Sequence, residues 1–336
     1  MPSSRPRLLV LAGETLFQSF FDAPRQRRLS RSFRWERTAA ISPARLRRHL
    51  ALADALLTTW DSPRFGEVLL ELAPRLRLIA HCGGEVKGRF ARPLFERLVI
   101  TNAPEPMAKP VAELAVAFLL HAARNLDGHR RALRGGASGV YERIHLHGTD
   151  ETILSRHVGL IGFGRIGQAV AELLRPFDVK LLVHDPYAPR ALARRYGVGF
   201  ASLRRVLSSS RFLVLAAALT EGTRGLLDAK ALATMPDGAT LINVARGGIV
   251  DLAALTREVR RGRLRCALDV TDPQEPLPAR HPLRTAEGAL LTPHVGASGA
   301  TVRRAMADVL IADLERFARG RAVRNRVRAR MLDQMT

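Results

Sequence analysis

The sequence is poor in cysteine and has no long apolar run, and each shortage narrows the classes of protein that it can encode. Only Cys82 and Cys266 are present, which excludes a disulfide framework and a cysteine-based zinc site. The longest apolar run, residues 110–123, contains Glu113 and His121 and falls short of the roughly 20 residues of a membrane-spanning helix. The apolar stretch near the N-terminus is too short for a secretory signal. We therefore expect a globular, cytoplasmic protein with no bound metal and no membrane partner.

Lysine is also scarce, because it supplies only four of the 53 basic residues. Arginine supplies the rest, and the formal net charge is +22. The arginines are spread along the chain instead of being gathered in one arm or helix. A basic surface attracts anionic substrates or nucleic acid over long distances. Since no cluster marks a binding face, we expect no dedicated nucleic-acid function.

Short apolar strands alternate with helices along the chain, a pattern typical of parallel sheets covered by helices on both faces. The predicted strands of the first part are residues 7–12, 53–59, 75–81 and 97–103. The predicted helices are residues 42–53 and 62–73, which both open with Ser-Pro, and a long helix from about Pro110 to Asn125. A second alternating series follows from residue 156, and a last helix starts near residue 300. The basic segment after Ala318 is predicted to be disordered.

The sequence HVGLIGFGRIGQAV holds Gly162, Gly164 and Gly167 in G-x-G-x-x-G spacing. An apolar strand precedes the motif and an amphipathic helix follows it. The next strand ends in Asp185, 18 residues after Gly167. This is the arrangement of a dinucleotide site, in which the first glycine permits a tight turn and the second lets the backbone approach the pyrophosphate. The third glycine lets the helix pack closely on the strand.

The helix after the motif begins with Arg165 and Ile166, and its free N–H groups are expected to bind the phosphates. An acid at position 185 accepts hydrogen bonds from the ribose hydroxyls and repels a 2′-phosphate. The sequence therefore favours NAD over NADP as the cofactor. Arg190, five residues after Asp185, leaves NADP open as the alternative.

The fingerprint appears only after about 150 residues, and the first strand of the chain lacks one. We therefore predict an α/β fold of two Rossmann-like or flavodoxin-like domains, in which the NAD-binding domain is inserted into a discontinuous substrate domain. The predicted substrate domain is residues 1–104 and 300–336. The predicted dinucleotide-binding Rossmann domain is residues 105–299.

Three segments after the fingerprint carry candidate catalytic residues. Arg246 follows the strand ATLINV, at the carboxyl end where open α/β sheets bind ligands, and its planar guanidinium can hold a carboxylate through two hydrogen bonds. A second strand ends at Asp269 and is followed by a loop that contains Glu275. The third segment, LLTPHVGAS, places His294 directly after a short apolar run.

These segments, in this order and near this spacing, resemble the D-isomer-specific 2-hydroxyacid dehydrogenase family, and the resemblance covers nearly the whole chain. It rests on the motifs GLIGFGRIGQAVA, HDPYAP, LTEGTRGLL, LINVARGGIVD, ALDVTDPQEPLP and LLTPHVGAS. The resemblance implies an NAD-dependent oxidoreductase that transfers a hydride between nicotinamide and C2 of a small 2-oxo or 2-hydroxy acid. It also implies a homodimer built on the cofactor domain, with residues 133–152 where relatives extend a dimer-forming arm.

The resemblance also implies a role for each candidate residue. Arg246 would bind the substrate carboxylate, His294 would be the general acid–base, and Glu275 would form a hydrogen bond with His294. The residues implied to border the cofactor are Val111, Ala245 and Asp269. Reduction of a 2-oxo acid needs a proton donor because negative charge develops on the carbonyl oxygen, and an adjacent carboxylate favours the imidazolium that supplies this proton.

The chain departs from the family pattern in the loop that carries the predicted glutamate. Asp269 and Glu275 lie six residues apart, one more than the family usually has. A rigid count puts Gln274 in the place of the glutamate, and a glutamine carries no charge. We favour a one-residue insertion that leaves the role with Glu275, and Asp272 is a weaker substitute.

The loop HCGGEVKGR in the first domain is the second departure, because it matches the family's substrate loop in position but differs from its usual glycine–aspartate-rich sequence. The backbone N–H groups of Gly84, Glu85 and Val86 are expected to receive the substrate carboxylate. Lys87 is either a second contact to an anion or a solvated lysine.

Two classes of function remain in view. The leading hypothesis is the NAD-dependent 2-oxo acid reductase, and the alternative is a non-catalytic NAD(H)-sensing protein of the co-repressor type. The intact set of Arg246, Glu275 and His294 favours the enzyme, because a sensor has no need of a proton donor. The substrate stays open among glyoxylate, hydroxypyruvate, phosphohydroxypyruvate and bulkier 2-oxo acids.

Overall fold

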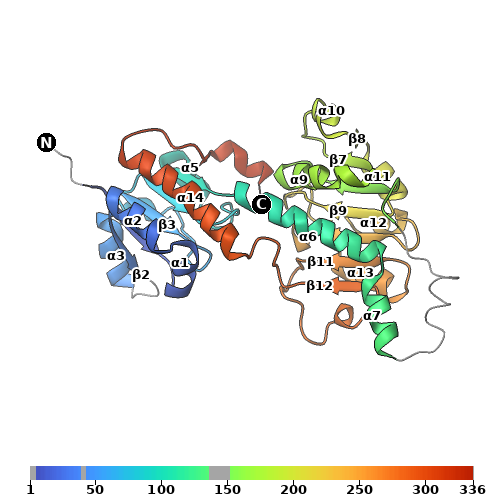
Figure 1. Cartoon of the computed structure of the whole chain (residues 1–336). Coiled ribbons are helices and arrows are strands. Elements are labelled where there is room, and N and C mark those ends of the chain that lie inside the picture. Colours follow the sequence, from blue (N-terminus) through green and yellow to red (C-terminus); the bar gives the residue numbers. More distant parts are fainter. Residues whose placement is uncertain (1–4, 39–42, 136–151, 336) are drawn as a thin grey trace. The chain divides into compact units, whose positions relative to one another are not determined.

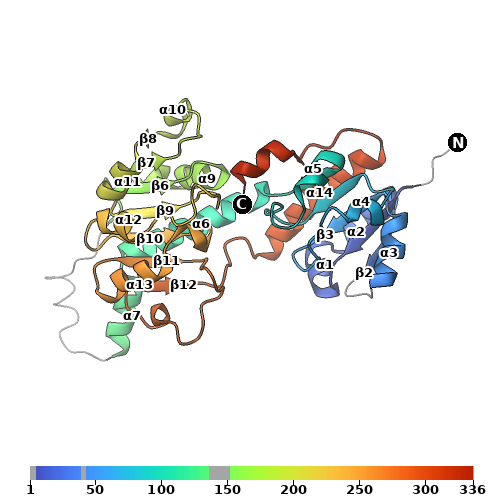
Figure 2. The same ribbon diagram turned by 180° about the vertical axis from the view of Figure 1, so that it is seen from behind.

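The computed structural model describes residues 5–38, 43–135 and 152–335 of the chain. The chain divides into two compact units (Figures 1 and 2). Unit 1 comprises Met1–Met107 and Ser298–Thr336, and unit 2 comprises Ala108–Ala297. Each unit has one sheet with helices on both faces, which confirms the predicted fold class.

Unit 1 has a six-stranded sheet in the order β13-β5-β4-β3-β1-β2. Its strands are β1 (Arg7–Leu11), β2 (Arg34–Thr38), β3 (Ala55–Thr58), β4 (Leu78–His81), β5 (Val99–Asn102) and β13 (Arg326–Val327). The first five are parallel, and β13 is antiparallel to β5. Because β2 and β3 flank β1 on opposite sides, the strand order reverses at the carboxyl ends of β1 and β3, where open α/β sheets bind ligands.

The continuous apolar sequence of the strands explains the two cores of unit 1, because successive side chains of a strand point to opposite faces of the sheet. Leu8 and Val10 of β1 pack under α1, α2 and α14, whereas Leu9 and Leu11 pack under the other helices. The first layer is α1 (Glu14–Phe20), α2 (Ala23–Ser32) and α14 (Ala300–Ala318), the last in red in Figure 1. The second layer is α3 (Pro43–Leu52), α4 (Leu69–Leu72), α5 (Arg92–Arg97) and the terminal turn Ala329–Gln334.

The prediction of a helix over residues 62–73 is wrong for most of that range. Helix α4 covers only Leu69–Leu72. The serine in the Ser-Pro pair does not act as a helix cap, because the Ser62 hydroxyl accepts a hydrogen bond from the N–H of Thr59 at 2.7 Å and donates one to the carbonyl of Leu11 at 2.5 Å. Ser62 therefore joins the ends of β1 and β3 instead of starting a helix.

The prediction of disorder after Ala318 is also wrong. Strand β13 extends the sheet beside β5, and the terminal turn packs on the second core. Asp313 of α14 is 1% exposed and accepts hydrogen bonds from the N–H groups of Arg324 and Asn325 at 2.7 and 3.1 Å. A buried carboxylate with these partners fixes the path of the chain after the helix.

Unit 2 has a seven-stranded parallel sheet in the order β12-β11-β10-β9-β6-β7-β8. Its strands are β6 (His157–Ile161), β7 (Lys180–His184), β8 (Gly199–Phe200), β9 (Phe212–Leu215), β10 (Thr240–Asn243), β11 (Arg265–Leu268) and β12 (Ala289–Leu291). The order reverses between β6 and β9. This places the predicted cofactor motif, which follows β6, at the switch point of the sheet.

Two helix layers cover the sheet of unit 2. The first is α6 (Glu105–Ala123) with α9 (Arg165–Leu174), and the second is α11 (Leu203–Ser209), α12 (Ala229–Thr234) and α13 (Leu252–Arg260). Helix α6 begins five residues before the predicted start, and Pro110 lies inside it. Helices α7 (Leu126–Arg134) and α10 (Leu192–Tyr196) also belong to the described part of this unit. Most of the predicted dimer arm, residues 136–151, lies outside the described residues, and no described helix is long and apolar enough to cross a membrane.

Candidate active site

The three glycines of the fingerprint each occupy a position that the predicted cofactor site requires. Gly162 has a φ of +92°, and a Cβ there would lie 2.5 Å from the backbone of Ala217. A Cβ on Gly167 would lie 2.3 Å from the carbonyl oxygen of Gly162. In contrast, no atom lies within 4 Å of the Cβ position of Gly164. The first and third glycines are therefore needed for packing, and the second leaves the backbone open to a ligand.

The N-terminus of α9 offers hydrogen-bond donors next to this opening. Gly164 is the N-cap residue, and its carbonyl accepts the first helical hydrogen bond from the N–H of Gln168 at 2.9 Å. The N–H groups of Arg165 and Ile166 precede this bond and have no partner within the helix. Free donors and the helix dipole favour a phosphate at this end. The residues of the loop therefore fit the pyrophosphate of a dinucleotide.

Asp185 follows β7 and ties the end of that strand to the glycine loop. One carboxylate oxygen accepts a hydrogen bond from the N–H of Phe163 at 2.7 Å. The other accepts from the N–H groups of Tyr187 and Ala188 at 2.8 and 3.0 Å. A carboxylate has about four acceptor positions, so one remains for a ribose hydroxyl.

His294 and Glu275 lie in direct contact. The Nδ1 atom of His294 and a carboxylate oxygen of Glu275 form a short hydrogen bond, and the other carboxylate oxygen accepts from the N–H of Thr271 at 3.2 Å. The carbonyl of Gln274 instead accepts from the hydroxyl of Thr271 at 2.6 Å. The loop conformation therefore turns Glu275, and not the neighbouring glutamine, toward the histidine. The Nε2 atom of His294 forms no hydrogen bond with a described residue, and the side chain is 48% exposed.

Asp269 fixes the loop that carries this histidine. It is 2% exposed, and its carboxylate accepts from the hydroxyl of Thr292 at 2.5 Å and from the N–H groups of Val295 and Gly296 at 2.8 and 2.9 Å. Its carbonyl accepts from the N–H of His294 at 2.9 Å. These bonds hold His294 at a φ of +55°, which few non-glycine residues adopt. Asp269 thus has a positioning role that the sequence did not reveal, and its predicted contact with the cofactor stays a prediction.

Val111 of α6 lies beside the same loop. A Cβ on Gly296 would be 3.3 Å from a methyl carbon of Val111 and 3.1 Å from the carboxylate of Asp269. Val111, the predicted neighbour of the cofactor, therefore lies next to Gly296, which follows His294 by two residues in the loop.

Arg246 follows β10 in a turn that Asn243 shapes. The side chain of Asn243 donates to the carbonyl of Arg246 and accepts from the N–H of Ala245, both at 3.0 Å. The guanidinium of Arg246 donates to the carbonyl of Ala245 at 2.7 Å. A Cβ on Gly247 would lie 2.1 Å from the backbone of Thr271, so this turn packs against the loop that carries Glu275. Asn243 is a further positioning residue, and only its place at the end of a strand could have suggested it.

The predicted substrate loop of unit 1 begins directly after β4. The N–H groups of Gly84, Glu85 and Val86 donate to no acceptor within the described residues. Gly84 and Glu85 are partly exposed, so their two donors are open to an anion, whereas Val86 is fully buried. The side chain of Asn102 holds the loop by donating to the carbonyl of Gly84 at 2.8 Å, and the side chain of Val86 is fully buried. Lys87 is exposed.

His81, the last residue of β4, lies beneath this loop and is fully buried. Burial, and next the charge of Arg89, lower the pKa of His81 to about 3, so the ring is neutral at ordinary pH. Its Nδ1 atom forms a hydrogen bond with the hydroxyl of Thr58 at 2.9 Å, and its Nε2 atom has no partner. A Cβ on Gly83 would lie 2.4 Å from Nε2, so the loop packs directly on the ring.

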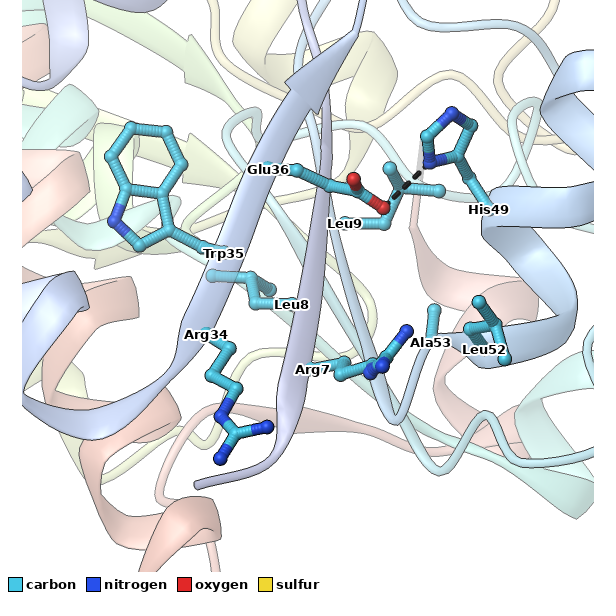
Figure 3. A pocket seen from close by; sticks show the side chains of 9 residues that line it. All are labelled: Arg7, Leu8, Leu9, Arg34, Trp35, Glu36, His49, Leu52 and Ala53. Carbon is cyan, nitrogen blue, oxygen red and sulfur yellow. Dashed lines mark hydrogen bonds and ion pairs between the residues drawn. The ribbon is translucent and has the colours of Figure 1, made fainter. Parts of the chain in front are cut away.

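A separate pocket of unit 1 lies at the amino-terminal ends of β1 and β2 (Figure 3). Arg7 and Arg34, the first residues of β1 and β2, line it together with Glu36 and His49, whose side chains form an ion pair at 2.6 Å. Because ligands of open α/β sheets bind at the carboxyl ends of the strands, this pocket is not the predicted site. Among the described residues, no group of three or more His, Cys, Asp or Glu side chains could hold a metal ion.

The glycine loop at the switch point of a parallel sheet places the chain among the dinucleotide-binding α/β proteins. Residues 116–296 match the D-isomer specific 2-hydroxyacid dehydrogenase, NAD binding domain. The chain is 30% identical over 293 residues to a glyoxylate reductase from Pyrococcus furiosus, with 85% of each protein covered. It is also 30% identical over 260 residues to a D-3-phosphoglycerate dehydrogenase from Methanocaldococcus jannaschii, which covers 76% of this chain and only 48% of that relative.

A solved structure agrees with these matches. The TT0316 protein from Thermus thermophilus has a TM-score of 0.79 and 30% identity, with 96% of this chain and 99% of that chain covered. The chain therefore belongs to the D-isomer-specific 2-hydroxyacid dehydrogenase family, whose members are NAD-dependent oxidoreductases that act on the CH–OH group of 2-hydroxy acids. The resemblance read from the sequence motifs is confirmed.

Proposed function

We propose that the protein is an NAD-dependent reductase of small 2-oxo acids that works in the reverse direction as a D-2-hydroxyacid dehydrogenase. The contact between His294 and Glu275 carries this proposal. A carboxylate on Nδ1 stabilises the imidazolium and leaves the proton on Nε2 available to a substrate oxygen. A protein that only bound NAD would have no use for this arrangement.

The residues of the site divide the work of the reaction. Arg246 binds the substrate carboxylate and orients the carbonyl group. His294 donates a proton to the carbonyl oxygen in reduction and accepts it in oxidation, while Glu275 holds the ring in place. NADH, when bound, supplies the hydride.

We propose NADH as the preferred cofactor over NADPH. Asp185 stands at the end of β7, where a 2′-phosphate would meet its carboxylate. The guanidinium of Arg190, the open alternative for a phosphate contact, lies over the ring of Phe200 at 4.7 Å. Catalytic efficiency with NADPH equal to or above that with NADH would contradict this preference.

We also propose a homodimer and a cytoplasmic location. The dimer is supported by the family to which the chain belongs. The location is supported by the two cysteines, Cys82 and Cys266, which are both buried free thiols and suit a reducing compartment.

The test of the proposed function is NADH oxidation by the purified protein with a panel of 2-oxo acids: glyoxylate, hydroxypyruvate, phosphohydroxypyruvate and 4-methyl-2-oxopentanoate. We expect turnover of at least one, and loss of most of the rate in the His294→Ala variant, with NADH binding retained. NADH binding without turnover of any 2-oxo acid would contradict the proposal and favour the NAD-sensing alternative.

A further inference from the structure

The pocket at the amino-terminal ends of β1 and β2 holds two arginines on one face of the sheet (Figure 3). Arg7 and Arg34 are partners in the register of these parallel strands, so their backbones lie about 4.8 Å apart and their side chains leave the same face. Both residues are exposed. Neither guanidinium forms a hydrogen bond or an ion pair with a described residue, although both backbone N–H groups have acceptors.

The acidic groups next to this pair already have other partners. Glu36, which also lines the pocket, forms an ion pair with His49 at 2.6 Å. Asp54 precedes β3 and accepts from the backbone N–H of Arg7 at 2.9 Å and from the guanidinium of Arg75 at 3.1 Å. The paired arginines therefore have no counter-charge among the described residues. Like charges at paired positions of neighbouring strands repel each other, and a bound anion would remove this cost.

The rest of the pocket limits the size of that anion. The cavity has a volume of about 220 Å³, which is below the roughly 300–1,000 Å³ of sites for larger organic ligands. Leu9, Leu52 and Ala53 give it apolar surface, and Leu52 is 45% exposed. The pocket therefore suits a small anion that carries at most a short organic group.

We propose that this pocket binds a phosphate group, either as inorganic phosphate or as a small phosphate monoester. Above neutral pH such a group carries about two negative charges, which match the two guanidiniums, whereas a carboxylate matches only one. The planar guanidinium also forms two parallel hydrogen bonds with phosphate oxygens. The predicted substrate loop follows the carboxyl end of β4, at the other edge of this parallel sheet, so the phosphate site is separate from the proposed active site.

The charge along the edge of the sheet favours the same ligand. Arg77 directly precedes β4 and Arg97 lies two residues before β5, and both are exposed at the edge that holds the pocket. Positive charge along one edge raises the local concentration of anions. In contrast, uncharged residues directly follow β1, β3, β4 and β5 at the carboxyl edge: Ala12, Thr59, Cys82 and Ala103.

Equilibrium dialysis with radiolabelled inorganic phosphate tests the site directly. The protein carries Arg246→Gln and is saturated with NAD⁺, so that the proposed active site and the dinucleotide site do not take up the label. We expect one phosphate per chain, and a Kd that rises at least tenfold when Arg7→Gln or Arg34→Gln is added, because each removes charge-assisted hydrogen bonds.

Arg97→Gln is the matched control, since it removes the same charge from the same edge but outside the pocket. It should change the Kd less than about twofold, because the interaction of exposed charges over this distance is largely screened by salt. Equal weakening by all three substitutions would reveal only a general attraction of anions and overturn the proposal. The absence of bound phosphate before these substitutions would also overturn it.

Thermal unfolding with NAD⁺ present gives a second measurement, in which the two buffers give opposite results. Without phosphate, Arg34→Gln should raise the melting temperature by roughly 1–3 °C, and by more than Arg97→Gln does, because the repulsion between paired arginines is removed. With phosphate at the same ionic strength, the wild type should gain more than Arg34→Gln, since a ligand stabilises the protein that binds it. Equal gains in both proteins would contradict the site.

Competition against the labelled phosphate identifies the form of the ligand. Tighter binding of glycerol 3-phosphate than of inorganic phosphate supports a monoester whose carbon chain covers Leu9 and Leu52. Equal or weaker binding of the ester supports inorganic phosphate. These results do not depend on turnover of any 2-oxo acid, so failure of the proposed function and failure of the phosphate site are distinguishable.

Discussion

The buried His81, beneath the predicted substrate loop, should make the stability of unit 1 fall in mild acid. The pKa of His81 is lowered from 6.5 to about 3 in the folded protein, first by burial and then by the charge of Arg89. Below pH 6.5 the unfolded chain binds a proton at this position and the folded chain does not. The contribution of the neutral, buried His81 to the free energy of unfolding is therefore fully present above pH 6.5 and is lost as the pH falls from 6.5 toward 3.

The size of this effect follows from the same shift. Each pH unit in this window costs about 1.4 kcal/mol of unfolding free energy for one proton. At pH 5 the loss is therefore about 2 kcal/mol, a large part of the stability of an ordinary domain.

Urea unfolding followed by tryptophan fluorescence can isolate this contribution, because Trp35 and Trp60 both belong to unit 1. In His81→Asn, the amide nitrogen can replace Nδ1 as the partner of Thr58, and the side chain at position 81 no longer binds a proton. Between pH 7.5 and pH 5, we expect the wild type to lose about 2 kcal/mol more unfolding free energy than this variant.

Thr58→Val is the matched control for this experiment. It removes the hydrogen bond at 2.9 Å but leaves the imidazole buried, so it should lower stability at both pH values while the pH dependence persists. If the stabilities of the wild type and His81→Asn fall in parallel as the pH drops, the reasoning from burial is refuted.

Three further predictions concern the active site and the assembly. Glu275→Gln should lower kcat for reduction roughly tenfold or more, because His294 loses the carboxylate that holds its ring, while Gln274→Ala should be nearly silent; equal rates for the wild type and Glu275→Gln would contradict the pairing. Gly164→Ala should fold normally but raise the KM for NADH, whereas Gly167→Ala should lower the melting temperature, since its Cβ would lie 2.3 Å from a carbonyl oxygen; the opposite order of effects would count against the assigned roles. Light scattering at micromolar concentration should show a dimer, and a monomer would refute that proposal.

The sequence predicted those parts of the fold that consist of continuous apolar runs. Strands β1, β3, β4 and β5 and the glycine loop after β6 were all expected, because buried parallel strands are continuous apolar runs. Strand β2 was missed for the opposite reason. It lies at the edge of the sheet, and its sequence RWERT has three charged residues, no buried residue and no apolar run.

The contact between His294 and Glu275 was only partly predictable. The sequence offered Asp272, Gln274 and Glu275 as partners for His294, and a rigid residue count pointed to Gln274 instead of the favoured Glu275. The conformation of the loop decides the contact, through the bond from the Thr271 hydroxyl to the carbonyl of Gln274. Such a turn depends on local bonds between residues that have no recognisable motif.

The positioning residues were not predictable from motifs at all. Asn243 acts through two hydrogen bonds to the backbone, and His81 through one to a hydroxyl group, and only the folded chain brings these partners near. A pattern search has no period or spacing by which to recognise either of them.

The discontinuity of unit 1 has a consequence for how the protein is made on the ribosome. Met306, Leu310 and Leu314 of α14 complete the core formed by α1, α2 and the first strands, yet all of unit 2 is translated between these parts. At about 5–20 residues per second, the early half of unit 1 waits roughly 10–40 s for its last helix. During this interval an apolar face of its sheet is uncovered, so the nascent chain should need chaperone protection that the continuous unit 2 does not.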